Sequence, residues 1–271
     1  MTIRPRKHFG QHWLKSEIVL EQIVDAARIE KNDRILEIGP GTGILTKRLL
    51  ECSEGVTAVE IDRDLCERLA RSLGKKSNFL LLQGDFLTLD LEQCLEKFPA
   101  FRPLNKVVAN IPYNITSPIL EKLLGSIVQP QRTTYESIVL LIQKEVAGRL
   151  CAIPSTKAYG ALSIRIQYLA AVEWICDVSS RAFSPPPEVD SAVVRLTPRT
   201  YPKPLPNPKK LNTLIDLGFA SRRKMLRNNL KSQVDPEKLS QILEQLNINP
   251  LSRAEDLSLD QWIDLCHQIT E

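Results

Sequence analysis

The chain has 271 residues, of which 43% are hydrophobic and 25% charged, a composition typical of globular proteins with enough apolar side chains for a core. Its formal net charge of +4 is compatible with a polyanionic partner but does not identify one. The chain has no apolar stretch long enough to span a membrane, its start MTIRPRKHFG contains no apolar secretion region, and its six cysteines and three histidines lack zinc-ligand spacing, so we expect a cytoplasmic protein without a bound metal.

The first predicted element is a helix over residues 16–29, where Ser16 is a candidate N-cap and apolar side chains such as Ile18 recur at helical spacing. Short apolar runs then alternate with stretches of helical periodicity, including 63–73 and 117–128. Strands that alternate with helices predict a mostly parallel sheet with helices on both faces. The apolar runs are residues 34–38, 56–60, 79–83, 106–109, 137–143 and 190–196.

The composition changes after the last of these runs. Residues 197–210 contain five prolines, which favours an extended linker. The segments beyond it that share helical periodicity are 211–220, 238–246 and 259–269. We therefore predict two domains, an α/β domain over residues 1–200 and a small all-helical domain over residues 201–271.

A glycine-rich turn follows the first predicted strand, in the sequence EIGPGTG (37–43). Gly39 and Gly41 leave no side chain between the backbone and a ligand, and the turn leads into a helix whose N-terminus favours polar or anionic groups. A dinucleotide normally requires Gly-x-Gly-x-x-Gly, whereas this turn reads Gly-x-Gly-x-Gly with Pro40 inside it. That spacing suits S-adenosylmethionine, which has no phosphate, although a glycine-rich turn alone is also a common structural feature.

Acidic residues stand at the ends of the next two predicted strands. Glu60 is placed to accept hydrogen bonds from both hydroxyls of a ribose, and Asp85 to accept one from the amino group of a base. Each acid taken singly is equally compatible with an ordinary strand-end turn. Together with the glycine turn, they predict the ligand crevice of an open α/β sheet, and they leave the identity of the nucleotide open.

The fourth predicted strand leads directly into Asn110, Ile111, Pro112 and Tyr113. The exocyclic nitrogen of adenine is a poor nucleophile because its lone pair is delocalised into the ring. Two acceptors for its hydrogens, the side-chain carbonyl of Asn110 and the backbone carbonyl of Ile111, would favour a pyramidal nitrogen, and Pro112 stiffens that peptide. Tyr113 offers a ring on which the base can stack. We therefore predict methyl transfer to an adenine amino group, through positioning rather than through a strong base.

With these motifs in place, the chain resembles the family of ribosomal RNA adenine N6,N6-dimethyltransferases, in particular the bacterial enzymes that act on 16S rRNA. The resemblance implies an α/β, Rossmann-like, S-adenosylmethionine-dependent methyltransferase fold with a small all-helical C-terminal domain. It extends over nearly the whole chain and rests on FGQHWL (9–14), LEIGPGTGILT (36–46), VEIDRDL (59–65), GDFL (84–87), NIPYNITSPIL (110–120), QKEVAGRL (143–150), KAYGALS (157–163), FSPPPEVDSAVVRL (183–196) and FASRRKMLRNNL (219–230).

The resemblance also implies a reaction and the residues that carry it. Two adjacent adenosines in the 3′-terminal hairpin loop of 16S rRNA would each receive two methyl groups, which consumes four S-adenosylmethionines. The target adenine would lie against residues 110–113, with Phe183 stacking on it from the opposite side. The chain departs from the family at His12, which replaces the usual asparagine, and an imidazole does not reproduce the geometry of an amide. The implied cofactor contacts are His12, Leu14, Gly39, Gly41, Glu60, Asp85 and Asn110.

The clearest basic run, SRRKMLRNNLK (221–231), contains no acidic residue. On a helix, Arg223, Arg227 and Lys231 would share one face, where their mutual repulsion favours contact with phosphates over a merely solvated surface. The run RPRK (4–7) is a second, weaker candidate. We therefore expect a monomer that binds 16S rRNA within the small ribosomal subunit. The predicted RNA-binding residues are Arg222, Arg223, Lys224, Arg227 and Lys231.

Other functions are compatible with parts of the sequence. Large-subunit rRNA adenine methyltransferases of the macrolide-resistance type share the glycine turn and the Asn-x-Pro-Tyr signature, although residues 143–150, 157–163 and 219–230 look more like the small-subunit enzyme. The chain could instead be an assembly factor that binds immature small subunits and whose catalysis is incidental. A nicotinamide oxidoreductase is disfavoured by the spacing of the glycines.

Overall fold

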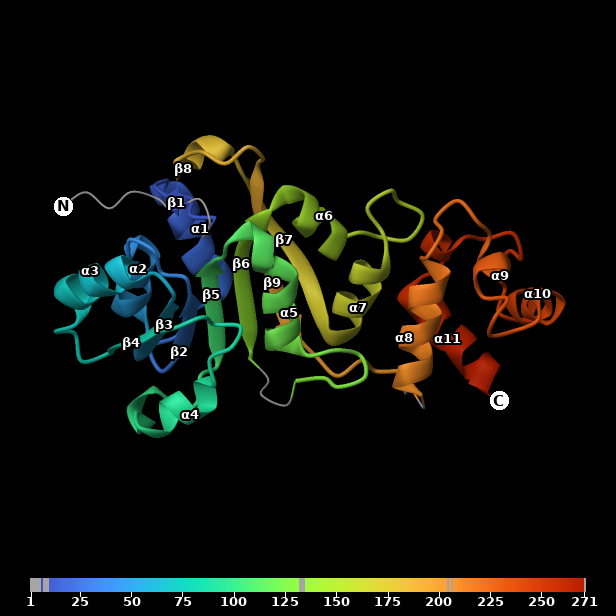
Figure 1. The fold of residues 1–271 in the computed structure, drawn as a ribbon, viewed down its shortest axis with the longest axis horizontal. Helices are drawn as coiled ribbons and strands as arrows, with labels where there is room; N and C mark the ends of the chain where they lie inside the picture. The colour runs from blue at the N-terminus through green and yellow to red at the C-terminus, as the bar shows by residue number, and fades with distance from the viewer. Residues whose placement is uncertain (1–5, 7–9, 132–134, 204, 206, 271) are drawn as a thin grey trace. The chain divides into compact units, whose positions relative to one another are not determined.

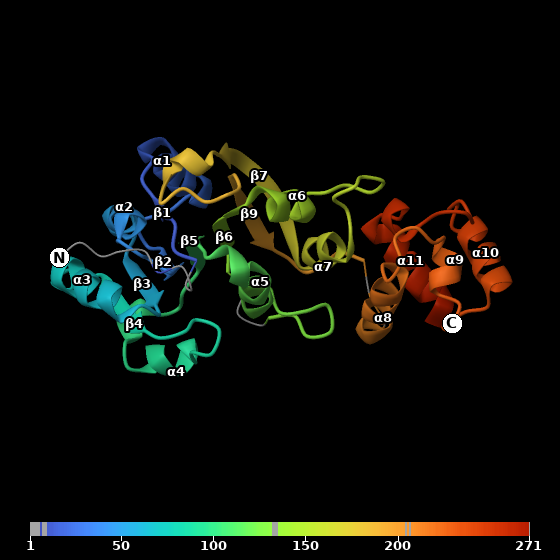
Figure 2. The ribbon, with the colours of Figure 1, turned by 45° about the horizontal axis from the view of Figure 1, so that its top comes forward.

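The computed structural model describes residues 6, 10–131, 135–203, 205 and 207–270, and the chain forms two compact units. The first unit comprises residues up to 124, 132–147 and 173–198, and the second comprises 125–131, 148–172 and 199 onward. The predicted boundary at residue 200 marks only the last of several crossings between the units, because Tyr159 and Ile164 belong to the core of the second. Figures 1 and 2 colour the chain by residue number, so the segments of each unit can be located in them.

The first unit is built around a seven-stranded sheet in the order β4-β3-β2-β5-β6-β9-β7 (Figure 1). Strands β2 to β6 are parallel to their neighbours, whereas β9 runs antiparallel to β6. The mostly parallel sheet is therefore confirmed, and β7 is a strand that the sequence patterns did not predict. The strands of this sheet are β2 (Arg34–Ile38), β3 (Gly55–Glu60), β4 (Phe79–Gln83), β5 (Lys106–Asn110), β6 (Ser137–Gln143), β7 (Ala170–Val178) and β9 (Ser191–Pro198).

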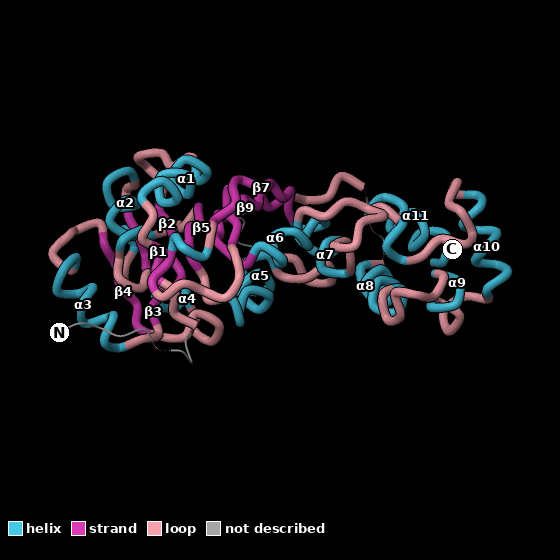
Figure 3. The backbone as a smooth tube through the Cα atoms, turned by 90° about the horizontal axis from the view of Figure 1, so that it is seen from above, coloured by secondary structure: helices cyan, strands magenta, loops and turns pink. Residues whose placement is uncertain are grey.

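Helices cover both faces of the sheet, which explains why its strands are nearly continuous apolar runs. Figure 3 shows α1 and α2 on one face and α5 on the other. A separate two-stranded ribbon pairs β1 (Trp13–Leu14) with β8 (Phe183–Ser184) in antiparallel register. The helices that follow the strands are α1 (Glu17–Ala27), α2 (Ile44–Cys52), α3 (Arg63–Leu73), α4 (Leu91–Glu96), α5 (Thr116–Leu124) and α6 (Lys144–Leu150), with one-turn helices η2 (Pro99–Phe101), η3 (Tyr113–Ile115) and η4 (Ser180–Ala182).

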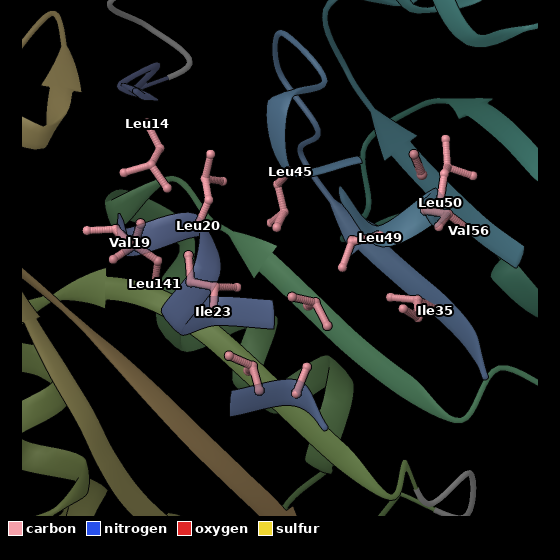
Figure 4. Packing of buried hydrophobic residues seen from close by; sticks show 14 of the residues in the cluster. Leu14, Val19, Leu20, Ile23, Ile35, Leu45, Leu49, Leu50, Val56 and Leu141 are labelled. Atoms are coloured by element: carbon pink, nitrogen blue, oxygen red, sulfur yellow. The ribbon is translucent and has the colours of Figure 1, made fainter. Parts of the chain in front are cut away.

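Helix α1 forms as predicted but buries a slightly different face. Ser16 occupies the N-cap position without a side-chain cap bond, and Ile18 is 70% exposed. Leu20 and Ile23 instead pack into the core beside Leu141 of β6 (Figure 4). Helical spacing predicted the helix, but the sheet on which the helix lies determines which of its faces is buried.

Helix α5 is shorter than the predicted segment 117–128. It ends at Leu124 because Gly125 takes a left-handed conformation with φ of +74°. A Cβ at Gly125 would lie 2.4 Å from the carbonyl oxygen of Gln129, so the chain turns back too tightly there for any other residue.

The second unit is mainly helical, and the three predicted helical segments of the C-terminal region are confirmed. Its core surrounds Trp262, which is fully buried together with Leu211 and Leu243. Helix α8 begins at Pro208, a residue that favours the first turn of a helix and ends the proline-rich linker. Its helices are α7 (Ala161–Leu169), α8 (Pro208–Gly218), α9 (Leu226–Asn229), α10 (Pro236–Gln245), α11 (Leu259–Thr270) and the one-turn η5 (Ala254–Asp256).

The prediction of one helix across the basic run 221–231 is wrong. Only α9 is helical there, and Met225 before it has an extended backbone. The Asn229 side chain donates to the carbonyl oxygens of Gly218 (2.6 Å) and Ser221 (3.0 Å), which folds the segment into a compact turn. Leu226 is buried, but Arg223, Arg227 and Lys231 do not share a helical face.

Some predictions fall on residues that are not described. The run RPRK lies outside the described residues except for Arg6, which pairs with Asp62 (3.3 Å) and Asp64 (2.5 Å). Two of the linker prolines, at positions 204 and 206, also lie outside them. In the part of the chain that is described, no helix has the length and apolar character that crossing a membrane requires.

Candidate active site

The first unit contains a cavity where the order of its strands reverses. From β2 the chain passes to β3 and β4 on one side, and then crosses to β5 and β6 on the other. Loops diverge at the carboxyl ends of strands beside such a point, which is where open α/β sheets bind ligands. The structure brings together around this cavity the predicted residues His12, Leu14, Gly39, Gly41, Glu60, Asp85, Asn110, Ile111, Pro112 and Tyr113.

The glycine turn after β2 depends on left-handed backbone conformations. Gly39, Gly41 and Gly43 have φ values of +68°, +57° and +80°, which other residues rarely adopt. A Cβ at Gly43 would lie 2.7 Å from Leu69 of α3, so this glycine also allows the turn to approach the neighbouring helix. The Gly41 N–H donates to Oε2 of Glu60 (3.1 Å), which links the turn to the end of β3.

Glu60 is held in place at the end of β3 by backbone groups. Its side chain is 5% exposed, and Oε1 accepts from the N–H of Asp62 (2.9 Å) while Oε2 accepts from Gly41. Burial raises the pKa of Glu60, whereas these N–H groups lower it. A carboxylate has about four lone-pair sites, so acceptor capacity remains for the two hydroxyls of a ribose.

Glu37 lines the cavity, although no role for it was predicted from the sequence. It is 1% exposed, and its Oε2 has no hydrogen-bond partner among the described residues. Burial raises its pKa to about 8, the Thr46 hydroxyl lowers it, and the nearby charge of Glu60 raises it further. The available signal was an acidic residue between the apolar residues Leu36 and Ile38 of the strand RILEI. A buried acceptor without a partner is costly unless a ligand supplies a donor.

The side chain of Asn110 has one orientation fixed by its neighbour. Its Nδ2 donates to the backbone carbonyl of His12 (3.2 Å), and a carbonyl can only accept, so the amide nitrogen must face His12. The Asn110 Oδ1 is therefore left as the acceptor on the other side. Pro112 follows Ile111 with φ of −60° and ψ of 134°, which turns the chain at the end of β5.

Tyr113 and His12 face each other across this end of the cavity. The Tyr113 hydroxyl hydrogen-bonds the hydroxyl of Ser191 (2.5 Å), and Nδ1 of His12 donates to the carbonyl oxygen of Pro185 (2.9 Å). Their rings are nearly parallel, with an angle of 18° and centroids 5.9 Å apart. The ring of His12 thus contacts Tyr113 and Pro185, and its backbone carbonyl accepts the hydrogen bond from Asn110.

Phe183 does not take the predicted place at the cavity. It is 1% exposed, belongs to the hydrophobic core, and is not among the described residues that line the cavity. Pairing of β8 with β1 sets Phe183 opposite Leu14 and turns its ring inward. Stacking of this ring on a base therefore stays a prediction, and in this structure the ring is packed in the core.

Comparison with known proteins identifies the family. Residues 3–271 match the family described as ribosomal RNA adenine dimethylase. This chain belongs to that family. Among its relatives, the ribosomal RNA small subunit methyltransferase A of Rippkaea orientalis is 64% identical over 96% of both chains. The protein of the same name from Nostoc sp. is 64% identical over 98% of both.

Solved structures of similar proteins agree with the assignment of this chain to the dimethylase family. A dimethyladenosine transferase from Plasmodium falciparum is 27% identical, covers 96% of this chain with 98% of its own, and superposes with a TM-score of 0.78. The 23S rRNA methyltransferase ErmE shares the fold, with a TM-score of 0.74, 24% identity, and coverage of 96% of this chain and 100% of its own. The protein is thus an S-adenosylmethionine-dependent methyltransferase with a Rossmann-like fold that acts on adenine in rRNA.

The cavity of the dimethylase fits its cofactor. Glu37 offers a buried acceptor without a partner, as an amino or hydroxyl donor requires. At Gly41 a Cβ would lie 3.2 Å from the ring of Trp13, so a larger residue would narrow the space between the glycine turn and Trp13 in the cavity lining. Ile61, 44% exposed, and Phe86 add apolar surface to the lining that can hold a purine ring.

The predicted RNA-binding residues of the dimethylase lie in the second unit and differ in their availability. Arg222 donates to Glu255 (2.6 Å) and to the carbonyl oxygen of Lys157 (2.9 Å), so much of its charge is already paired. Arg227 is half-buried. Arg223, Lys224 and Lys231 are exposed and remain the better candidates for phosphate contact.

Replacing Glu37 by glutamine should change how stability depends on pH. The pKa of Glu37 is raised from 4.5 to about 8, so the folded state holds a proton that the unfolded state loses within this interval, and stability falls as pH rises through it. Glu37→Gln removes that loss. We expect the melting temperature of the variant to gain on the wild type between pH 4.5 and 8 and to keep its advantage above 8. Parallel curves of melting temperature against pH would contradict the assignment.

Proposed function

We propose that this protein dimethylates the N6 amino groups of two adjacent adenosines in the 3′-terminal hairpin loop of 16S rRNA, within the small ribosomal subunit, and consumes four S-adenosylmethionines. The names of its relatives, small subunit methyltransferases A at 64% identity, support the choice of subunit. The observation that carries the proposed chemistry is the orientation of Asn110, whose Oδ1 is left available by the bond from Nδ2 to His12.

The cofactor would be held by the carboxylates and the glycine turn of the first unit. Glu60 would accept hydrogen bonds from the ribose hydroxyls, and Asp85 would accept one from the amino group of the cofactor's adenine. Glu37 would meet a donor of the cofactor with its unpartnered oxygen. Leu14 and His12 would close the cavity from the side of β1. When bound, S-adenosylmethionine supplies an electrophilic methyl carbon.

The protein's own contribution is to orient the target amino group. The Oδ1 of Asn110 and the carbonyl oxygen of Ile111 would accept its two N–H groups, which pulls nitrogen lone-pair density out of the adenine ring and directs it at the methyl carbon. Such preorganised acceptors stabilise charge where it develops. The methylated nitrogen is acidic enough to lose its proton without a strong base.

Stacking of the target base is assigned to Tyr113. Its hydroxyl hydrogen-bonds Ser191, which is fully buried, and this contact orients the ring in the lining of the cavity. Stacking of a base on an aromatic ring contributes about 1–3 kcal/mol. Stacking of Phe183 on the opposite side of the base stays a prediction, since its ring is buried in the core.

The exposed cations of the second unit would contact rRNA phosphates. Replacing Arg223 and Lys224 by glutamate should weaken binding to small subunits and lower the slope of log K against log salt by about 0.7–0.9 for each phosphate that the variant no longer neutralises. Titrations at several salt concentrations measure this slope. The matched control is Lys75→Glu with Lys76→Glu, an exposed pair after α3 with the same charge change. If both double variants have the wild-type slope, residues 223 and 224 lie outside the interface.

The reaction itself is tested by mapping methylated nucleosides. Unmethylated small subunits, small-subunit rRNA and large-subunit rRNA are each incubated with labelled S-adenosylmethionine, and the products are digested and sequenced by mass spectrometry. We expect dimethyladenosine at two adjacent positions of the 16S hairpin loop. Label in large-subunit rRNA instead would favour the macrolide-resistance type of activity and overturn the proposal. The cytoplasmic location and the monomeric state stay predictions.

A further inference from the structure

The ammonium group of Lys122 binds the turn after β4, which lines the cavity. It lies on α5, the helix that begins just after the Asn-Ile-Pro-Tyr motif. Its Nζ donates to the carbonyl oxygens of Phe86 (2.6 Å), Leu87 (3.2 Å) and Leu89 (2.7 Å). An ammonium group has three donors, and here three carbonyls converge on it. Its Nζ also lies 5.0 Å from the centroid of the Phe86 ring, within range of a cation–π contact.

The segment that receives these bonds is the turn after β4. Asp85 closes it by accepting the N–H of Leu87 at Oδ1 (2.9 Å) and the N–H of Leu89 at its backbone carbonyl (2.8 Å). Residues 84–87 line the cavity, and Phe86 is 6% exposed. The turn therefore presents the Asp85 carboxylate to the cavity on one side and its carbonyl oxygens to Lys122 on the other.

Burial and nearby carboxylates have opposite effects on the pKa of Lys122. Burial lowers its pKa, and the negative charges of Asp85 and Asp90 act in the opposite direction. Lysine is thus kept near the Asp85 carboxylate in a partly buried site, where a hydrogen bond from a charged donor is worth more than one in water.

We propose that Lys122 is a positioning residue for cofactor binding, which fixes the 84–89 turn on α5 so that Asp85 and Phe86 are preorganised for the adenine of S-adenosylmethionine. This inference rests on the proposed role of Asp85 as the acceptor for that adenine. Without the ammonium group, the three carbonyl oxygens lose their shared donor and the turn is free to sample other conformations. The apparent Kd for the cofactor equals the intrinsic Kd divided by the fraction of molecules whose turn has the binding-competent conformation, so it rises when that fraction falls.

The test uses Lys122→Met in the full-length protein. We expect the Kd for S-adenosylmethionine, measured by calorimetry, and the KM for the cofactor to rise by about tenfold or more, while kcat falls by less than about threefold. Native-state hydrogen exchange should be faster in the 84–89 turn and unchanged in β6. This pair of readouts separates local loosening of the cavity wall from a general loss of stability.

The control is Lys97→Met, which removes an exposed lysine from the end of α4. An unchanged cofactor Kd in Lys122→Met would overturn the proposal, even if exchange in the turn becomes faster. If the methionine variant does not fold, Lys122→Arg decides, because a planar guanidinium cannot meet three converging carbonyls as an ammonium does. A raised Kd then supports the proposal and an unchanged Kd overturns it. Failure of the proposed function is distinguishable, since it would show as the wrong methylated nucleoside with the Lys122 effect on Kd intact.

Discussion

Replacing Asn110 by alanine should lower kcat for adenine methylation by about 100- to 1,000-fold, the range found when one preorganised hydrogen-bonding group is removed from an active site. The variant loses the Oδ1 acceptor for the target amino group, and it also loses the Nδ2 bond to His12 that fixes the amide. Single-turnover methylation of unmethylated small subunits, with cofactor at saturation, measures the effect on the chemical step.

The same variant should bind small subunits with nearly wild-type affinity, because Asn110 is assigned to the base and not to phosphates. This separates the proposed enzyme from an assembly factor whose catalysis is incidental. Asn110→Asp is the informative companion, since it keeps an oxygen acceptor but places a negative charge against the His12 carbonyl, and it should also be strongly impaired. Equal losses of subunit binding and of methylation in Asn110→Ala would contradict the separation of these roles.

Replacing Glu60 by glutamine should raise the Kd for S-adenosylmethionine by about 100-fold, or about 2.7 kcal/mol, as expected for hydrogen bonds to a charged group. Glutamine keeps the shape of the side chain, but its NH2 group must face one of the two backbone N–H donors, at Gly41 or Asp62. The ribose hydroxyls then lose an acceptor. Calorimetric titration with the cofactor and with S-adenosylhomocysteine measures the change.

Glu21→Gln is the matched control, because Glu21 lies on the exposed side of α1 in the same unit. The control should bind the cofactor like the wild type. Melting temperatures of both variants must be compared, since Glu60 also ties the glycine turn to β3. If Glu60→Gln melts as the wild type does and retains its cofactor affinity, the ribose does not bind at the end of β3.

The sheet and the cavity were predictable because both follow from local patterns. Strands buried on two faces read as apolar runs, and parallel strands bring their carboxyl ends to one edge. The residues at or just after the ends of those strands, such as Glu60, Asp85 and Asn110, consequently meet around one cavity. Strand β7 escaped prediction because AAVEWICDV mixes polar and apolar residues and follows α7 without a break.

Other features of the structure depend on contacts between residues that are not adjacent in the chain. The ring of Phe183 is turned inward by pairing with Leu14, far away in the chain. The basic run 221–231 does not form its expected helix because Asn229 bonds with Gly218 and Ser221. Likewise, no sequence pattern shows that Lys122 meets the carbonyls of the turn after β4. Such interactions depend on the packing of elements, which spacing along the chain does not encode.

The most direct test of the proposed chemistry is a crystal structure of the protein with the methyl-donor analogue sinefungin and an adenosine-containing RNA fragment. We expect the adenine N6 at about 2.8–3.1 Å from both Asn110 Oδ1 and the Ile111 carbonyl oxygen. The amine that stands for the transferable methyl should face N6 at about 3–3.5 Å. An analogue whose amine points away from residues 110–113, or an adenine bound elsewhere, would contradict the account.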